Sequence, residues 1–287
     1  MGMTKSPEAF VHCDQDLARR LERCESHANA SFVDARASLS PDLGACWKDC
    51  GGTWAMFDGI GSPLTQTFGL GLFNQPDDAE VETLEEFFHA RSADTMHEVC
   101  LLADPSVLSL LSRRGYRVIE WSQVLCQRLA QPMADTVPPP NPIKVRHSQP
   151  EEADAWAGVA ALGWRTEAPD LEDFLRAIGQ VNARAEATHC FFAELDGVPI
   201  AAGALHLHDG VALMAGASTI PSARGRGAQR ALLTARLAFA QEAGCDLAMM
   251  VAAPGSTSQH NAQRAGFQNV YARIKWSKAA PTHPGAP

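Results

Sequence analysis

The sequence predicts an α/β protein of the α+β type, in which two units each have a mixed, mostly antiparallel sheet flanked by helices. Three observations support this fold class. Apolar runs typical of strands alternate with amphipathic helical segments along the whole chain. Asp-Gly pairs at 196–197 and 209–210 separate consecutive apolar runs, as in β-hairpins. A proline-rich segment lies near the middle of the chain.

That proline-rich segment sets the expected domain boundaries. Residues 131–142 include Pro132, Pro138, Pro139, Pro140 and Pro142, a density that neither a helix interior nor a central strand tolerates. We therefore expect a first domain at 1–130, a linker at 131–142 and a second domain at 143–278. Residues 279–287 are rich in proline and alanine and are expected to form a disordered tail.

In the first half, the spacing of apolar residues predicts alternating helices and strands. Val81, Leu84, Phe87 and Phe88, for example, share one face of a helix. The expected elements are helices at about 14–37, 79–90 and 105–114 and strands at about 53–57, 64–72, 96–102 and 118–125.

In the second half, Pro150 and the acids after it suit the first turn of a helix, and Gly244 suits the end of another. The unbroken apolar run at 247–253 is typical of a strand buried on both faces. The expected elements are strands at 143–147, 190–195, 198–208, 211–220, 247–253 and 267–276 and helices at 150–162, 169–181, 228–243 and 256–265.

Composition excludes several classes of protein. The chain has 287 residues, 46% of them hydrophobic, and a formal net charge of -9, so it is neither disordered nor a general nucleic-acid binder. No uncharged apolar run approaches the roughly 18–20 residues that span a bilayer, and the first residues lack an apolar signal core. We expect a cytoplasmic protein without membrane or nucleic-acid partners. Cys46 and Cys50 are the only close cysteine pair, and we expect no metal site.

The most informative motif is the glycine-rich turn Arg224-Gly225-Arg226-Gly227-Ala228-Gln229, which joins a strand to a helix. The first N–H groups of a helix lack intrahelical partners and lie at the positive end of its dipole, so they favour anions. The glycines bring no Cβ near the backbone, and the arginines add charged donors. A tight solvated turn is the other interpretation. A P-loop is excluded because no Gly-Lys-Ser/Thr follows, and hairpin-linked strands argue against a dinucleotide fold.

This turn and the order of the elements resemble the GNAT superfamily of N-acetyltransferases over residues 143–278. The family's motif is Gln/Arg-x-x-Gly-x-Gly/Ala, and Arg224 and Gly227 match its first and fourth positions. Gln229 departs from the sixth position, where its side chain could crowd a phosphate. The resemblance implies the fold of that family and acetyl-coenzyme A (acetyl-CoA) as co-substrate.

The resemblance also implies which residues bind acetyl-CoA. Amides of the turn would hold the pyrophosphate, the end of the fourth strand would bind the pantetheine arm through its backbone, and an Asn on the short last helix would lie near that arm. The implied residues are Ser218, Thr219, Arg224, Gly225, Arg226, Gly227, Ala228, Gln229 and Asn261.

The acid and the base of the reaction are less evident. Family members often place a Tyr acid four residues before a Gly-Phe pair, but Ala262 stands there. Tyr271 is the catalytic candidate, since a phenol with a pKa of about 10 can protonate a thiolate; a core aromatic is the alternative. His206 and His208 share one strand face but flank a turn, which is typical of exposed side chains. Water relayed by backbone carbonyls or Ser218 could also serve as the base.

The first half resembles a degenerate copy of the same plan. Gly115-Tyr116 precedes a strand as Gly266-Phe267 does, but residues 74–78 (Asn-Gln-Pro-Asp-Asp) replace the phosphate motif. Their acids would repel a pyrophosphate. We expect that residues 1–130 bind no acetyl-CoA and instead pack against the second half, closing off the acceptor site.

The function expected from this resemblance is N-acetyl transfer from acetyl-CoA to a primary amine, by direct attack on the thioester. A small-molecule acceptor is favoured because the first domain would narrow access, with the Trp164 region as another boundary. The alternatives are a non-catalytic acyl-CoA sensor or scaffold and a different acyl donor. The sequence leaves the acceptor and the oligomeric state open.

Overall fold

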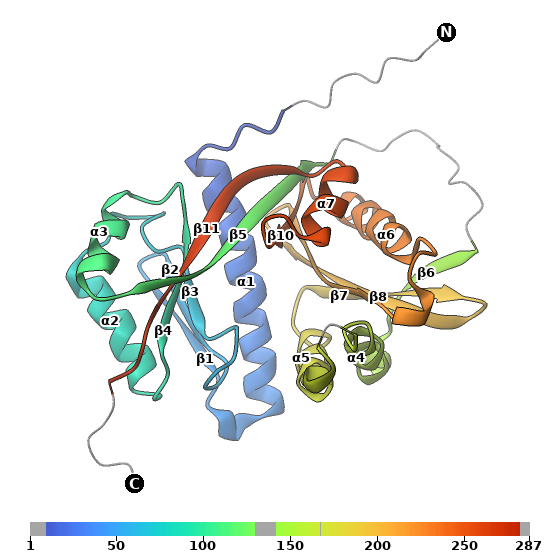
Figure 1. The fold of residues 1–287 in the computed structure, drawn as a ribbon, viewed down its shortest axis with the longest axis horizontal. Helices are drawn as coiled ribbons and strands as arrows, with labels where there is room; N and C mark the ends of the chain where they lie inside the picture. The colour runs from blue at the N-terminus through green and yellow to red at the C-terminus, as the bar shows by residue number, and fades with distance from the viewer. Residues whose placement is uncertain (1–9, 130–141, 167, 282–287) are drawn as a thin grey trace.

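The computed structural model describes residues 10–129, 142–166 and 168–281 (Figure 1). Most of the expected linker at 131–142 and of the tail at 279–287 lies outside these residues. The expected helices and strands are present, except that the strand expected at 64–72 is limited to residues 66–68, and there is one further strand, β1. The first half contains α1 (Gln15–Leu39), β1 (Cys46–Cys50), β2 (Thr53–Phe57), β3 (Gln66–Phe68), α2 (Asp78–His89), β4 (Thr95–Cys100), α3 (Ser106–Arg113) and β5 (Arg117–Arg128).

The second half contains β6 (Ile143–His147), α4 (Ala153–Leu162), α5 (Glu172–Asn182), β7 (Thr188–Leu195), β8 (Val198–His208), β9 (Val211–Thr219), α6 (Ala228–Glu242), β10 (Leu247–Ala252), α7 (Thr257–Arg264) and β11 (Gln268–Lys278). The two Asp-Gly turns have positive φ at both residues, 52° and 78° at 196–197 and 47° and 69° at 209–210. These are the backbone conformations that the hairpin prediction requires. Within the described residues, no helix has the length and apolar character needed to cross a bilayer.

The described strands form one mixed sheet in the order β1-β2-β3-β4-β11-β5-β10-β9-β8-β7-β6. Each half contributes its last strand to the other half: β11 pairs with β4, and β5 pairs with β10. The two exchanged strands also pair with each other along most of their length. The halves therefore share one continuous sheet, and β5 and β11 form its centre.

Helix α1 covers this centre and contacts strands of both halves, β1 and β2 on one side and β8 and β9 on the other (Figure 1). Its buried residues Leu21 and Cys24 pack with Val124 of β5, Leu213 of β9 and Met249 of β10. Because this apolar cluster draws on both halves, neither half buries its core alone.

Polar contacts also join the halves beneath α1. The guanidinium of Arg273, on β11, donates to Glu22 and Glu25 of α1, each at 2.6 Å. Arg273 and Glu22 are almost fully buried. Arg20 of α1 forms an ion pair with Asp246, just before β10. Removing one partner of the buried Arg273–Glu22 pair would leave the other charge uncompensated, so this contact favours one relative placement of the halves.

In the second half, helices cover both faces of the sheet. Alternate residues of β8 face opposite sides: Ala202 and Ala204 pack against Trp156 of α4, whereas Ala201 and Leu205 pack on the side of Leu232 of α6. Helix α5 lies beside α4 and also contacts α1. The α4 face and the α6 face are thus separate environments on the two sides of one sheet.

Candidate functional site

The sheet opens between β9 and β10, the parallel pair of the second half. Only three residue pairs are in register, Val211 with Leu247, Ala212 with Ala248, and Leu213 with Met249. The rest of β9, from Met214 to Thr219, does not pair with β10 in the described structure. This edge of six residues spans about 20 Å, and its unpaired backbone groups can hydrogen-bond an extended ligand.

A β-bulge lies in β9 next to this opening. The register with β8 passes from Ala202–Ser218 to Ala204–Ala215, so β9 has one extra residue there, and Gly216 has φ 58°. Arg236 of α6 lies behind the bulge, where its Nη1 donates to the carbonyls of Ala204 and Ala215 at 2.7 and 3.2 Å. Ala204 lies on β8 and Ala215 on β9, so Arg236 hydrogen-bonds both strands next to the bulge.

Arg236 is 3% exposed, and in the described part of the chain it has no carboxylate partner. Burial lowers the pKa of its guanidinium to about 10, so the group stays charged at neutral pH. A buried cation next to the bulge favours negative charge near it. The sequence contains a signal for this residue, since Leu232, Arg236 and Ala240 form one buried stripe of α6.

The turn after β9 leads directly into the N-terminus of α6. Gly225 and Gly227 have φ 77° and 87°, a conformation that glycine adopts at little cost. Gly227 is the N-cap, no side chain of the described residues caps the helix, and its first turn has no acid. The N–H groups of this turn are therefore available at the positive end of the helix dipole, which is the geometry expected for an anion site.

The side chains around the turn mostly stabilise its shape. Arg224 donates to the carbonyls of Thr219, at 3.3 Å, and of Gly163, at 2.7 Å. Gln229 donates to the Thr219 hydroxyl at 2.8 Å, so its side chain lies against the end of β9 and not across the turn. Arg226 is exposed. The crowding expected from Gln229 is thus relieved by this hydrogen bond.

The end of α4 packs tightly on the end of β9. The Ser218 hydroxyl donates to the Ala160 carbonyl at 2.8 Å. A Cβ on Gly163 would lie 2.3 Å from the Ser218 Oγ and 3.0 Å from the Thr219 amide nitrogen. The sequence analysis did not single out Gly163, because its role depends on a contact between elements far apart in the chain.

The structure therefore brings together eight predicted binding residues at one corner of the molecule, and the other two predicted site residues lie on different elements. Asn261 is exposed on α7, and the neighbouring Ala262 is buried against Phe267. A tyrosine in place of Ala262 would have to displace this packing.

Tyr271 lies on β11, under α1. It is buried, its hydroxyl donates to the Glu22 carboxylate at 2.9 Å, and it packs with Leu21 and Cys100. Burial and the nearby Glu22 carboxylate raise the pKa of Tyr271 well above its usual value. The hydrogen bond gives this phenol a structural partner, and its role as the acid stays a prediction.

The two histidines of β8 are not the exposed side chains that the turn suggested. His206 is 3% exposed, and both rings contact His27 of α1. The prediction was wrong for His206 because it considered the turn alone, whereas α1, from the other half of the chain, covers this strand. His27 was missed, since no local pattern marks it.

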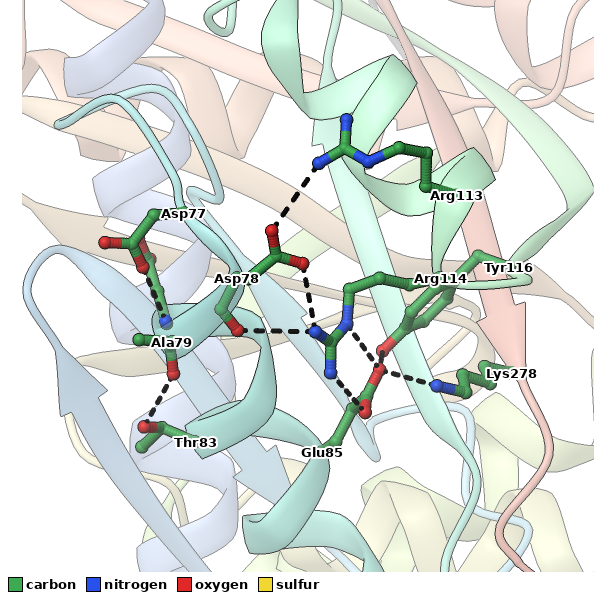
Figure 2. Close-up of polar contacts among 10 residues, drawn as sticks. Asp77, Asp78, Ala79, Thr83, Glu85, Arg113, Arg114, Tyr116 and Lys278 are labelled. Carbon is green, nitrogen blue, oxygen red and sulfur yellow. Dashed lines mark hydrogen bonds and ion pairs between the residues drawn. The ribbon is translucent and has the colours of Figure 1, made fainter.

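In the first half, helix α2 also follows a strand and a connecting segment, but its N-terminus is capped and acidic. At the start of α2, Asp77 caps the helix by accepting from the Glu80 N–H at 2.8 Å, and Asp78 contacts Arg113 and Arg114 (Figure 2). The segment between β3 and α2 buries Leu70 and Leu72. The amide of Asp104 closes the segment by donating to the Gly71 carbonyl at 2.7 Å.

Comparisons with known proteins agree with this architecture. Residues 154–267 match the sequence model of the Acetyltransferase (GNAT) family. No curated protein sequence matches the chain. Among solved structures, a GCN5-related N-acetyltransferase from Kribbella flavida is 19% identical, with a TM-score of 0.57 over 89% of this chain and 96% of that one.

Two further structures are similar over most of the chain. A tandem GNAT protein from the clavulanic acid biosynthesis pathway is 14% identical, with a TM-score of 0.57 over 80% of this chain and 79% of that one. A GCN5-related N-acetyltransferase from Sphaerobacter thermophilus is 16% identical, with a TM-score of 0.53 over 94% and 95%. At these identities the likeness concerns the fold. Residues 154–267 therefore match the family model of the GNAT acetyltransferases, and the chain as a whole is similar in fold to a tandem GNAT protein.

Proposed function

We propose that this protein transfers the acetyl group of acetyl-CoA to the primary amine of a small molecule. The observation that carries the proposal is the uncapped N-terminus of α6 directly after the opening between β9 and β10. A diphosphate would accept from the amides of residues 227–229, and the pantetheine arm would follow the free edge of β9 from Thr219 toward Met214. In this placement the thioester lies near the bulge at Gly216.

The transfer would proceed by direct attack of the neutral amine on the thioester carbonyl. The cysteines of this half do not suggest a covalent intermediate: burial raises the pKa of Cys190 to about 12 and also raises that of Cys245, so both thiols are protonated at neutral pH. The cation of Arg236 behind the bulge would favour the oxyanion of the transition state. Tyr271 remains the predicted acid for the leaving thiolate.

The first half is proposed to close the acceptor side. Helix α1 contacts β8, β9 and α5, and therefore lies on the α4 face of the sheet next to the opening. Trp164, exposed after α4, would form another boundary. A site enclosed in this way favours a small acceptor over a protein chain, which needs open access.

A non-catalytic acyl-CoA sensor is the second candidate function. It is favoured by Ala262 at the position of the usual acid and by the hydrogen bond that engages the Tyr271 hydroxyl. Such a protein would bind the carrier at the same site without releasing thiol.

Two measurements on the full-length protein test the proposal. Calorimetry with acetyl-CoA measures binding, and thiol release with a mixed panel of small primary amines measures transfer. We expect one binding event and turnover with some amines, and a lower rate in Tyr271→Phe if the phenol is the acid. Tight binding without thiol release from any amine would favour the sensor. Absence of binding would exclude both functions.

A further inference from the structure

We propose that His27, on α1 of the first half, is the general base of the acetyl transfer, and that His206, on β8 of the second half, is a positioning residue for its ring. This inference rests on the proposed function and names the residue that makes the amine nucleophilic. It also gives the first half a chemical role at a site whose carrier motif lies entirely in the second half.

The histidines form a connected chain. His27 Nδ1 lies 2.9 Å from His206 Nε2, and His206 Nδ1 lies 3.2 Å from the Thr188 hydroxyl of β7. His208 stacks on His27 from the other side, with ring centroids 4.0 Å apart and an interplanar angle of 19°. The ring of His27 is therefore held by one hydrogen bond and one stacking contact, while the residue stays only half-buried. A positioned but accessible imidazole is what a general base requires.

The position of His27 follows from the path of α1 along β9. Arg20 contacts the Asp209 carbonyl before β9, Cys24 contacts the Val211 carbonyl, and His27 reaches His206. His206 is opposite Leu213 in the β8–β9 register. Leu213 is also in the last pair between β9 and β10. The histidine pair thus lies at the level where the sheet opens.

The proposed binding mode brings the thioester to this level. The diphosphate would lie at the far end of β9, and the arm would run back along its free edge toward Met214, the residue next to Leu213. The bulge that disturbs β9 begins at Ala215, two residues from Leu213. An amine on the α4 and α1 side of the sheet would then lie between the thioester carbonyl and His27.

The surroundings keep the supporting histidines neutral. Burial, and then the rings of His27, His208 and His189, lower the pKa of His206 to about 3. Burial also lowers the pKa of His208, which lies near His27, Arg23 and Asp209. With the His206 Nδ1–H donating to Thr188, its Nε2 accepts from the His27 Nδ1–H. The lone pair at His27 Nε2 then remains available for a proton.

The chemical step is balanced as follows. The imidazole of His27 takes one proton from the substrate ammonium, and the freed nitrogen lone pair forms the C–N bond with the thioester carbonyl carbon. The C–S bond breaks and its electron pair leaves on sulfur. The acid, predicted to be Tyr271, protonates the thiolate, and the second N–H proton of the amine restores the acid. The proton on His27 passes to solvent. The products are the acetamide, coenzyme A and one proton.

The experiment compares two probe nucleophiles with acetyl-CoA and full-length protein. 2-Phenylethylamine is an ammonium ion at neutral pH and needs a base, whereas O-benzylhydroxylamine is already neutral. In His27→Gln, we expect kcat/KM to fall about 100-fold with phenylethylamine and by less than about fivefold with benzylhydroxylamine. His206→Gln should shift the phenylethylamine rate in the same direction by a smaller factor.

The controls separate this role from a structural one. His147→Gln alters an exposed histidine of β6 that contacts Phe239 and should leave both rates unchanged. Circular dichroism and calorimetry with acetyl-CoA verify fold and carrier binding, and His27→Asn replaces His27→Gln if the latter does not fold. Equal loss with both probes, or no loss with phenylethylamine, would overturn the inference alone. Absence of thiol release from the wild-type protein would overturn the proposed function and this inference together.

Discussion

Two helix N-termini, one in each half, follow a strand of the sheet, but their first turns differ in charge and capping. At α6 the N-cap is Gly227 with no capping side chain in the described structure, and the first turn carries no acid. At α2 the N-cap is Asp77, whose carboxylate accepts from Glu80, and Asp78 and Glu80 occupy the first turn. One helix start leaves its donors available to a ligand, whereas the other satisfies them with its own carboxylates.

This difference shows that a helix dipole alone does not define an anion site. Both helices have the same positive end, but a carboxylate at the N-cap takes the donor that a phosphate would need. The segments that precede the two helices also differ in whether they leave space for a ligand. Leu70 and Leu72 are buried between β3 and α2, whereas the end of β9 remains unpaired next to β10. In the first half, the chain's own side chains thus occupy the space before the helix and the first donor of its N-terminus.

The largest effect is expected from giving the start of α6 the charge of α2. In Arg226→Glu/Arg230→Glu, two exposed cations beside the turn become anions. Two charge-assisted contacts of this kind contribute about 3 kcal/mol or more, so acetyl-CoA affinity should fall at least about 100-fold. Calorimetry measures the dissociation constant.

The control for this variant is Arg184→Glu, an arginine outside the turn that forms an ion pair with Asp154. It changes the net charge by the same sign without approaching α6, so acetyl-CoA affinity should change by less than about threefold at 0.15 M salt. An unchanged affinity in the double variant would contradict the assignment of the turn as the diphosphate site.

Two glycines with positive φ, one before each helix, allow the two segments to be compared through the stability of their alanine variants. A Cβ on Gly71, in the filled segment of the first half, would lie 2.2 Å from the Val107 Cγ2, and its φ is 71°. Gly71→Ala should therefore lower the free energy of unfolding by about 3 kcal/mol. Gly227→Ala meets no atom within 4 Å, so only its φ of 87° is unfavourable and the loss should be about 1 kcal/mol.

Denaturant unfolding of the two glycine variants gives both values. Gly227→Ala should in addition weaken acetyl-CoA binding, which Gly71→Ala should leave unchanged in the folded protein. Equal destabilisation by the two substitutions would mean that the segment before α2 is as open as the turn before α6.

Much of the fold could be predicted from local patterns, but the exchange of strands could not. β5 and β11 each follow a helix and a glycine-aromatic pair, and each has apolar residues that suit a central strand. Nothing within either strand distinguishes pairing with its own half from pairing with the other half. β1 was missed because Lys48 and Asp49 interrupt its apolar pattern, which an edge strand tolerates.

In the candidate site, too, features made by consecutive residues could be predicted, whereas contacts between residues far apart in the chain could not. The turn at 224–229 was identified because its donors belong to consecutive residues. Tyr271 and His206 were also singled out, but their surroundings come from α1, 249 and 179 residues away in the two hydrogen bonds. A period-two pattern indicates which residues share a face and does not indicate what covers that face.

Cations hold the acidic start of α2 in place, and Glu85 is the centre of their network. Its carboxylate accepts from Arg114, Tyr116 and Lys278, the last residue of the exchanged strand β11 (Figure 2). Burial alone would raise the pKa of Glu85, but the hydrogen bonds from Arg114, Lys278 and Tyr116 outweigh it and lower the pKa to about 2. Glu85→Gln should cost about 2 kcal/mol of stability at pH 7, since the amide retains part of these hydrogen bonds.

The sign of the pH dependence follows from the lowered pKa. The contribution of Glu85 is complete above its ordinary pKa of 4.5 and is lost as the pH falls toward 2. The difference in unfolding free energy between wild type and Glu85→Gln should therefore shrink below pH 4.5. Denaturant titrations at pH 7, 4 and 3 measure it, and a difference that stays constant over this range would contradict the network.

The smallest effect is expected at the cap of α2. Asp77→Ala removes the acceptor of the Glu80 N–H and should lower stability by about 1 kcal/mol, whereas Asp77→Ser keeps an acceptor and should cost only a few tenths. Acetyl-CoA binding is the more telling measurement. In Asp77→Ser/Asp78→Asn/Glu80→Gln the charge of the first turn resembles that of α6, but Leu70 and Leu72 still fill the space before the helix. Calorimetry should find one binding event, as in the wild type. A second event would show that charge alone separates the two halves.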